Sequence, residues 1–264
     1  MMIDIPAVNQ PILEVRHLNV WYGHCQVLYD MNLTISASLI TSVIGARKCG
    51  KSTLLGSLNR TIQRSDVVRL SGSVTLLQRD LYDPKLDPGW VGRHVGMVFA
   101  RSAPFPVSIR DNILFGYCLH REQKGRIAVS EADQVVEMAL RQVGLWTRLK
   151  DQLRRSAARG LTDEERLRLC IARVLPLKPT LLLLDDPCQM LDPQGCAAIE
   201  ELIWELRLQC AIVLATSNLA QARRLSDVTV FISRGRIVEA APTDRLFVAP
   251  AKHKTADYIE GRSV

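Results

Sequence analysis

The stretch from Leu39 to Ser52, LITSVIGARKCGKS, decides the fold. It begins with a short β-rich apolar run and ends in G-x-x-x-x-G-K-S, with Gly45, Gly50 and Lys51 at fixed positions. Glycines let the backbone curl so that several N–H groups point at one phosphate, and the lysine adds a positive charge. Because a strand-like run precedes the motif and a helix-forming stretch follows it, the motif predicts a phosphate-binding loop.

The loop motif also predicts which residues contact a nucleotide. Lys51 should reach the β- and γ-phosphates, Ser52 should hold Mg²⁺, and the following helix should add the positive end of its dipole. The alternative is a chance Gly/Lys turn, but such a turn would not be expected to follow an apolar strand and open a helix. The residues expected to bind the nucleotide here are Gly45, Ala46, Arg47, Lys48, Cys49, Gly50, Lys51, Ser52 and Thr53.

A second apolar run, LLLLDDP, ends in two carboxylates. Leu181 to Leu184 is typical of a buried strand, and Asp185 follows it directly. An aspartate in that position beside a phosphate-binding loop holds Mg²⁺. The alternative is a buried strand with a solvated acidic end. Given the loop upstream, we favour a magnesium site made by Ser52 and Asp185.

The hydrophobic pattern predicts one α/β domain. Residues Ile12 to Ile35 alternate between apolar and polar, which is typical of strands with one buried face. The short apolar runs Leu39–Ile44, Thr180–Leu184 and Ala211–Thr216 are typical of a parallel sheet covered on both faces. We therefore predict a P-loop NTPase core with a mostly parallel sheet and an N-terminal antiparallel β subdomain.

A helix-rich, charged block interrupts this core at about residues 106–177. The run VSEADQVVEMALRQVGL has apolar residues at helical spacing, with Ser130 as the expected N-cap. We interpret the block as a helical insertion, so that the core comprises about residues 12–105 and 178–247. Residues 248–264 are predicted to be a polar C-terminal tail.

The composition excludes several classes of protein. With 47% hydrophobic and 23% charged residues in 264, the chain has the balance of a globular protein. No apolar run approaches the roughly 18 residues that a membrane-spanning helix needs. Seven cysteines occur without a CxxC pair, which favours a reducing compartment and argues against a zinc site. The net charge of +7 selects no partner.

The order of the motifs resembles the ATP-binding subunit of ABC transporters, in particular that of bacterial phosphate importers. The resemblance extends from Ile12 to about Phe247, and the segment PFPVSIRDNI at Pro104–Ile113 indicates the phosphate-importer branch. The other motifs that carry it are the Tyr22-Gly23 turn, the phosphate loop, VGMVF at 95–99, RLCIAR at 168–173, LLLLDDP, LDP at 191–193 and TSN at 216–218.

This resemblance implies ATP and Mg²⁺ as cofactors and an ABC ATPase fold over residues 12–264. It implies that two subunits, as a homodimer or a heterodimer, enclose two ATP molecules, each between one phosphate loop and the partner's signature segment. It also implies permease partners and a peripheral place on the cytoplasmic side of the inner membrane. Tyr22 would stack on adenine, a contact of about 1–3 kcal/mol; otherwise it is an ordinary aromatic at a strand end.

The chain departs from this family at positions that act after binding. The lid-loop glutamine is Ala100, the general-base glutamate is Asp186, and the switch histidine is Ser217. Aspartate sets its carboxylate back by roughly 1 Å, and misplacement on this scale costs on the order of 10²-fold in rate. Within the loop, Lys48 replaces a glycine and would be strained at a positive φ.

The signature segment differs most. The family's LSGGQ is Leu161-Thr162-Asp163-Glu164-Glu165 here. Thr162 and Glu165 fit a capping box, which would satisfy the helix N–H groups that otherwise bind the partner's γ-phosphate. Each carboxylate about 4 Å from a phosphate charge would cost on the order of 4 kcal/mol at an effective dielectric near 20. The alternative is that Mg²⁺ or loop movement relieves this repulsion.

Three functions remain from the sequence. We expect an ATP-binding subunit of a phosphate-type importer that hydrolyses ATP weakly or not at all. The alternative is a non-catalytic regulatory or assembly paralogue that binds ATP and the permease. A nucleic-acid ATPase is disfavoured, so no nucleic-acid partner is expected. We interpret the arginines of the helical block as one solvated helical face; they are Arg154, Arg155, Arg159, Arg166 and Arg168.

Overall fold

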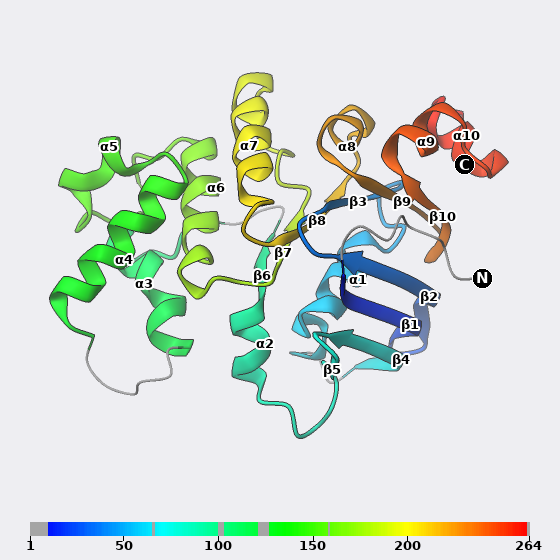
Figure 1. Ribbon diagram of the computed structural model, residues 1–264, viewed down its shortest axis with the longest axis horizontal. Helices are drawn as coiled ribbons and strands as arrows, with labels where there is room; N and C mark the ends of the chain where they lie inside the picture. The colour runs from blue at the N-terminus through cyan, green and yellow to red at the C-terminus, as the bar shows by residue number, and fades with distance from the viewer. Residues whose placement is uncertain (1–9, 65–66, 100–102, 121–126, 158, 263–264) are drawn as a thin grey trace.

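The computed structural model describes residues 10–64, 67–99, 103–120, 127–157 and 159–262 (Figure 1). Two β-sheets lie side by side, and a block of helices stands on the far side of the larger sheet from the smaller one (Figure 1). This is the predicted α/β arrangement. None of the helices in these ranges is both long enough and apolar enough to span a membrane.

Four strands within residues 11–80 form an antiparallel sheet in the order β2-β1-β4-β5. Leu13, Val15, Leu18 and Val20 of its central strand are fully or almost fully buried. The alternating pattern therefore gives one buried face, as expected. The strands are β1 (Pro11–Tyr22), β2 (Cys25–Ser36), β4 (Val68–Leu76) and β5 (Arg79–Asp80).

The second sheet has six strands in the order β10-β9-β3-β8-β7-β6. All neighbours pair in parallel except β10, which is antiparallel to β9. The strands β3, β7 and β8 are buried along their whole length, which explains their largely apolar sequences. The strands are β3 (Ile40–Ile44), β6 (Val95–Val98), β7 (Leu181–Asp185), β8 (Ala211–Thr216), β9 (Val228–Ser233) and β10 (Arg236–Pro242).

The helices fall into two groups. Those of the predicted insertion are α3 (Ile109–His120), α4 (Val129–Gln142), α5 (Trp146–Leu149) and α6 (Asp163–Ala172), with the short 3₁₀ helices η2 (Lys150–Gln152) and η3 (Leu175–Leu177). Those of the core are α1 (Lys51–Leu58), η1 (Thr61–Arg64), α2 (Pro88–His94), α7 (Pro193–Leu206), α8 (Leu219–Leu225), α9 (Thr243–Val248) and α10 (His253–Ile259).

The C-terminal segment is not merely a polar tail. It contains α10, whose Tyr258 stacks on Phe231 of β9 with ring centroids 4.7 Å apart. The carboxylate of Glu239 accepts hydrogen bonds from the backbone N–H groups of Ala251 (2.8 Å) and Lys252 (3.0 Å). These contacts attach the end of the chain to the sheet.

The parallel strands set the position of the candidate site. The central strands β3, β8 and β7 end at Ile44, Thr216 and Asp185, and they run in the same direction. Their carboxyl ends therefore meet at one edge of the sheet, the usual place for ligands in open α/β sheets. The phosphate loop, Ser217 and Asp186 directly follow these ends.

Candidate functional site

The phosphate loop joins β3 to α1 through a tight curl. A Cβ at Gly45 would clash with the backbone oxygen of Ile232, and Gly50 has φ +113, so both glycines are required. Lys48 has φ +63, the strained geometry that the sequence analysis anticipated for a positive φ. A non-glycine residue in this region costs about 1–2 kcal/mol. The loop nevertheless keeps its curl.

Lys51 lies at the centre of this loop. Its side chain is only 8% exposed, and Nζ donates to the backbone oxygens of Gly45 (2.7 Å) and Ala46 (3.1 Å). The first turn of α1 has no side-chain cap from Gly50 and contains no acidic residue. A buried ammonium and an open helix N-terminus together make a site for phosphate groups.

Asp185 ends β7 beside the loop. Burial raises the pKa of its carboxyl above the ordinary value, and the neighbouring Asp186 raises it too, whereas a hydrogen bond from Ser52 and the charge of Lys51 oppose this. The predicted magnesium residues Ser52 and Asp185 are thus in contact. A carboxylate and a hydroxyl are oxygen donors that suit Mg²⁺, so the residues present fit the ion.

Asp186 and Ser217, which directly follow the ends of β7 and β8, lie next to each other. Ser217 Oγ is 3.5 Å from Asp186 Oδ2, a weak hydrogen bond at most. Asp186 has φ +45, and its N–H donates to the backbone oxygen of Ala215 at 2.7 Å, which fixes the start of the loop. No imidazole is available at this point.

Arg47, Asp186 and Ser217 line one groove of about 490 Å³. The structure therefore brings residues from the phosphate loop, the β7 end and the β8 end together. The signature segment 161–165 is not part of this groove. Ala100 lies outside the described residues. Tyr22 ends β1 and is 38% exposed, so the residue is partly accessible.

Sequence reasoning missed a cluster on the far wall of the groove. Gln221 is fully buried, with Nε2 3.0 Å from Cys188 Sγ and 3.4 Å from Glu200 Oε1, and Glu200 pairs with Arg224. Cys196 also lies beside Gln221. These residues come from α7, α8 and the loop after β7, so no single stretch of sequence could have identified the cluster. Within the described ranges, no His, Cys, Asp and Glu group suits a metal ion.

The N-terminus of α6 is closed by its own side chains. Thr162 Oγ1 accepts from the N–H of Glu165 (3.2 Å), and Glu165 Oε2 accepts from the N–H of Thr162 (2.9 Å), so the predicted capping box is present. Leu161 is buried just before it. At the start of α6 the N–H groups of Thr162 and Glu165 are therefore bonded by side chains, whereas α1 has no side-chain cap at its start.

The acidic charges of this segment are paired, which sequence reasoning did not foresee. Arg168 Nε lies 2.7 Å from Glu164, Arg148 Nε lies 2.6 Å from Glu165, and Arg166 lies 3.4 Å from Asp163. Each guanidinium offsets much of the repulsion that its carboxylate would exert on a phosphate. The occupied N–H groups, more than net charge, therefore distinguish this segment from an anion site.

Comparisons with known proteins agree with this geometry. The family model of the ABC transporter matches residues 28–189. A phosphate import ATP-binding protein, PstB, of Bacillus cereus is 39% identical over 97% of this chain and 93% of its own. PstB of Bacillus anthracis shows the same identity and coverage.

A solved structure, cbiO1 from Clostridium perfringens, described as part of the ABC transporter complex cbiONQ, has the same fold. It aligns with a TM-score of 0.75 at 22% identity and covers 94% of both chains. The family model and the relatives match most of this chain and include its phosphate loop. The chain therefore belongs to the ABC transporter family and is similar to its ATP-binding proteins over nearly its whole length.

Proposed function

We propose that this chain is the ATP-binding subunit of a phosphate-type importer, and that it binds Mg·ATP but hydrolyses it weakly or not at all. The observation that carries the second half is the combination of a self-capped α6 with Asp186 and Ser217 at the reacting positions. The first half is supported by its relatives, which are phosphate import ATP-binding proteins.

The binding half rests on the phosphate loop. Lys51 and the open start of α1 would hold the phosphates, and Ser52 with Asp185 would hold Mg²⁺, which neutralises phosphate charge when bound. Tyr22 is partly exposed and would stack on adenine. These residues bind and orient the nucleotide.

The reacting half lacks its usual groups. A general base must lie within hydrogen-bond reach of the attacking water. Asp186 has a side chain one methylene shorter than the expected glutamate, and Ser217 provides no imidazole toward the γ-phosphate. Loss of a positioned base costs on the order of 10²–10⁴-fold in rate. Water attack would therefore be slow even with ATP in place.

The closed α6 start affects the other half of a composite site. In a dimer of the family type, each nucleotide needs the partner's signature segment. In a mixed dimer with an intact partner, the partner's phosphate loop would face the capping box of this chain. At the other site, the partner's signature segment would face the phosphate loop of this chain, with Asp186 and Ser217 beside it. Neither site would be complete, so pairing would not restore turnover.

A rescue series tests this proposal. Asp186→Glu, Ser217→His, Ala100→Gln and restoration of LSGGQ at 161–165 should regain phosphate release only in combination. Asp186→Asn, combined with the other three changes, is the matched control for Asp186→Glu. It keeps the size of the side chain but removes its charge, so this combination should not regain phosphate release. Rapid phosphate release by the unmodified chain, alone or mixed with an intact relative, would contradict the proposal.

An exposed aromatic pair supports association with a permease on the cytoplasmic side of the membrane. Phe105 and Phe115 pack edge to face at 4.9 Å, yet they are 37% and 54% exposed, and Arg173 lies 4.3 Å above the Phe105 ring. Exposed aromatic residues beside an arginine are typical of interface centres. Co-purification of a permease with the chain should be lost in Phe115→Asp and retained in Leu208→Asp, an exposed apolar residue elsewhere.

The second candidate is a regulatory or assembly subunit that binds ATP and the permease without driving transport. The self-capped α6 favours it, because a helix start closed by its own side chains does not require a nucleotide. Phosphate uptake in cells distinguishes the two. Loss of uptake on Lys51→Ala supports the importer subunit, whereas altered control with uptake retained supports the regulatory role.

A further inference from the structure

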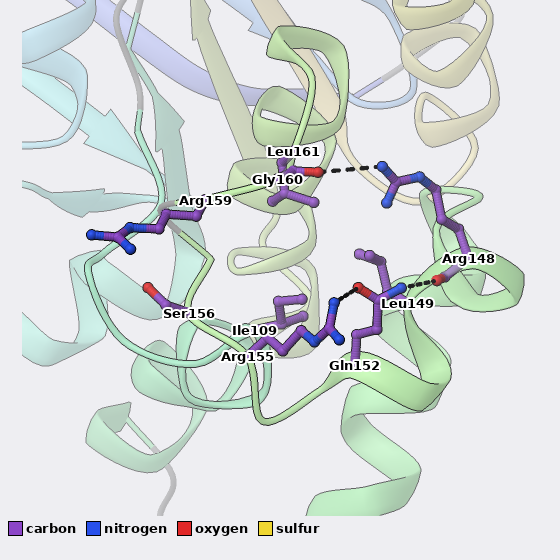
Figure 2. Close-up of a pocket in the computed structure, with 9 residues that line it drawn as sticks. All are labelled: Ile109, Arg148, Leu149, Gln152, Arg155, Ser156, Arg159, Gly160 and Leu161. Atoms are coloured by element: carbon purple, nitrogen blue, oxygen red, sulfur yellow. Dashed lines mark hydrogen bonds between the residues drawn. The ribbon is translucent and has the colours of Figure 1, made fainter.

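A second, basic cavity lies between α5 and the loop that leads into α6 (Figure 2). It has a volume of about 330 Å³, within the range of small-molecule sites. Ile109 and Leu149 give it a buried apolar part, and three arginines line the rest. These are Arg148, Arg155 and Arg159.

These arginines do not form the solvated helical face that the sequence analysis expected. Arg155 and Arg159 lie in the irregular segment before α6, and only Arg166 and Arg168 lie on the helix itself. In Figure 2, Arg148 extends toward Gly160 and Arg155 toward Gln152, while Arg159 extends on the other side of the loop. The cavity is thus flanked by guanidinium groups from two elements.

The positive charge here is not balanced by the protein. Arg155 donates to the neutral Gln152 Oε1 at 3.1 Å, and neither Arg155 nor Arg159 pairs with a carboxylate in the described part of the chain. Arg148 does pair, with Glu165 at 2.6 Å, and its Nη2 donates to the backbone oxygen of Gly160 at 3.3 Å. At least two cations at the cavity therefore have no counter-charge.

We propose that this cavity binds a phosphoryl group carrying two or more negative charges. The guanidinium fork matches phosphate oxygens through paired N–H donors, and charge-assisted bonds of this kind are about twice as strong as neutral ones. Arg155 and Arg159 both line the cavity, and a multiply charged anion balances more of this unpaired positive charge than a single carboxylate does. The same chemistry occurs in free diphosphate and in an anionic phospholipid headgroup.

Arg148 couples this cavity to the start of α6. An anion in the cavity competes with Glu165 for its guanidinium group, and Glu165 is one half of the capping box. Binding of the anion therefore releases the ion pair that holds the Glu165 carboxylate in place, and Glu165 in turn weakens binding of the anion. The cavity is a site through which a phosphoryl ligand regulates the signature segment.

The test is calorimetric titration with inorganic diphosphate in a Lys51→Ala background, which removes binding by the phosphate loop. We expect saturable binding that is weakened about tenfold by Arg155→Gln, the effect of losing one hydrogen bond to a charged group. Arg154→Gln is the matched control and should bind as before, because the neighbouring Arg154 does not line the cavity. Glu165→Gln should bind more tightly, because the competition for Arg148 is removed.

A second arm identifies the source of the phosphoryl group. Vesicles of phosphatidylglycerol, with phosphatidylcholine vesicles as the control, are sedimented with the same variants. Binding that depends on Arg155 in either arm supports the site and names its ligand. Equal binding by Arg155→Gln and Arg154→Gln in both arms, with unchanged melting temperatures, overturns the proposed site. The proposal also fails if diphosphate binds only when Lys51 is present and vesicle binding does not depend on Arg155.

Discussion

At the scale of single residues, the carboxylate of Asp185, a proposed Mg²⁺ ligand, lowers the stability of the fold. Burial raises the pKa of its carboxyl, so the folded chain holds the proton more tightly than the unfolded chain does. Stability from this group is therefore present below the ordinary pKa of 3.8 and is lost as the pH rises through the raised folded value. At neutral pH its ionised form opposes folding.

Asp185→Asn should therefore raise the melting temperature at neutral pH and abolish the further rise produced by Mg·ATP. The measurement is a thermal melt with and without Mg·ATP. Asp192→Asn is a control of the same chemistry: Asp192 caps α7, asparagine caps a helix about equally well, and the melting temperature should stay close to that of the unmodified chain. A lower melting temperature for Asp185→Asn would show that its carboxylate stabilises the fold.

At the scale of elements, the two helix starts α1 and α6 have opposite designs. Thr162→Ala removes one half of the capping box and should lower the free energy of unfolding by about 1 kcal/mol. Thr162→Ser keeps the hydroxyl and should lose much less. Urea denaturation of the three proteins measures this, and equal midpoints for alanine and serine would mean that the cap does not stabilise α6.

The C-terminal helix α10 depends on one buried carboxylate. Glu239 is 8% exposed and accepts two backbone N–H groups before α10. Glu239→Ala removes both hydrogen bonds, each of about 1.5–3 kcal/mol because the acceptor is charged, so α10 should detach more readily. Limited proteolysis should then cut after Lys252 or Lys254. Resistance equal to that of the unmodified chain would show that the Phe231–Tyr258 stack alone holds the helix.

The spacing of apolar residues along the chain predicted individual helices and strands, but not their exact ends. Helix α4 was expected from its spacing, but it begins at Val129 with Ala128 in the N-cap position, so Ser130 is not the cap. The attachment of α10 through Glu239 was not predictable, because its donors follow it by 12 and 13 residues with no recurring pattern.

At the scale of the whole molecule, the sequence predicted the strands of both sheets, the phosphate loop and the capping box, because each is recognisable from a few consecutive residues. It did not reveal the Gln221 cluster or the Arg148–Glu165 pair. Those contacts join residues from separate elements, and only packing brings them together. Sites made by a few consecutive residues could thus be predicted from the sequence, whereas contacts between residues of separate elements could not.

The central claim is that this chain binds a nucleotide that it does not cleave. Equilibrium binding of Mg·ATP and steady-state phosphate release, measured on one preparation, test it most directly. We predict saturable binding that Lys51→Ala abolishes, with phosphate release on the order of 10²-fold or more below that of the fully restored variant. Phosphate release equal to that of the restored variant, and lost on Asp186→Ala, would contradict the claim.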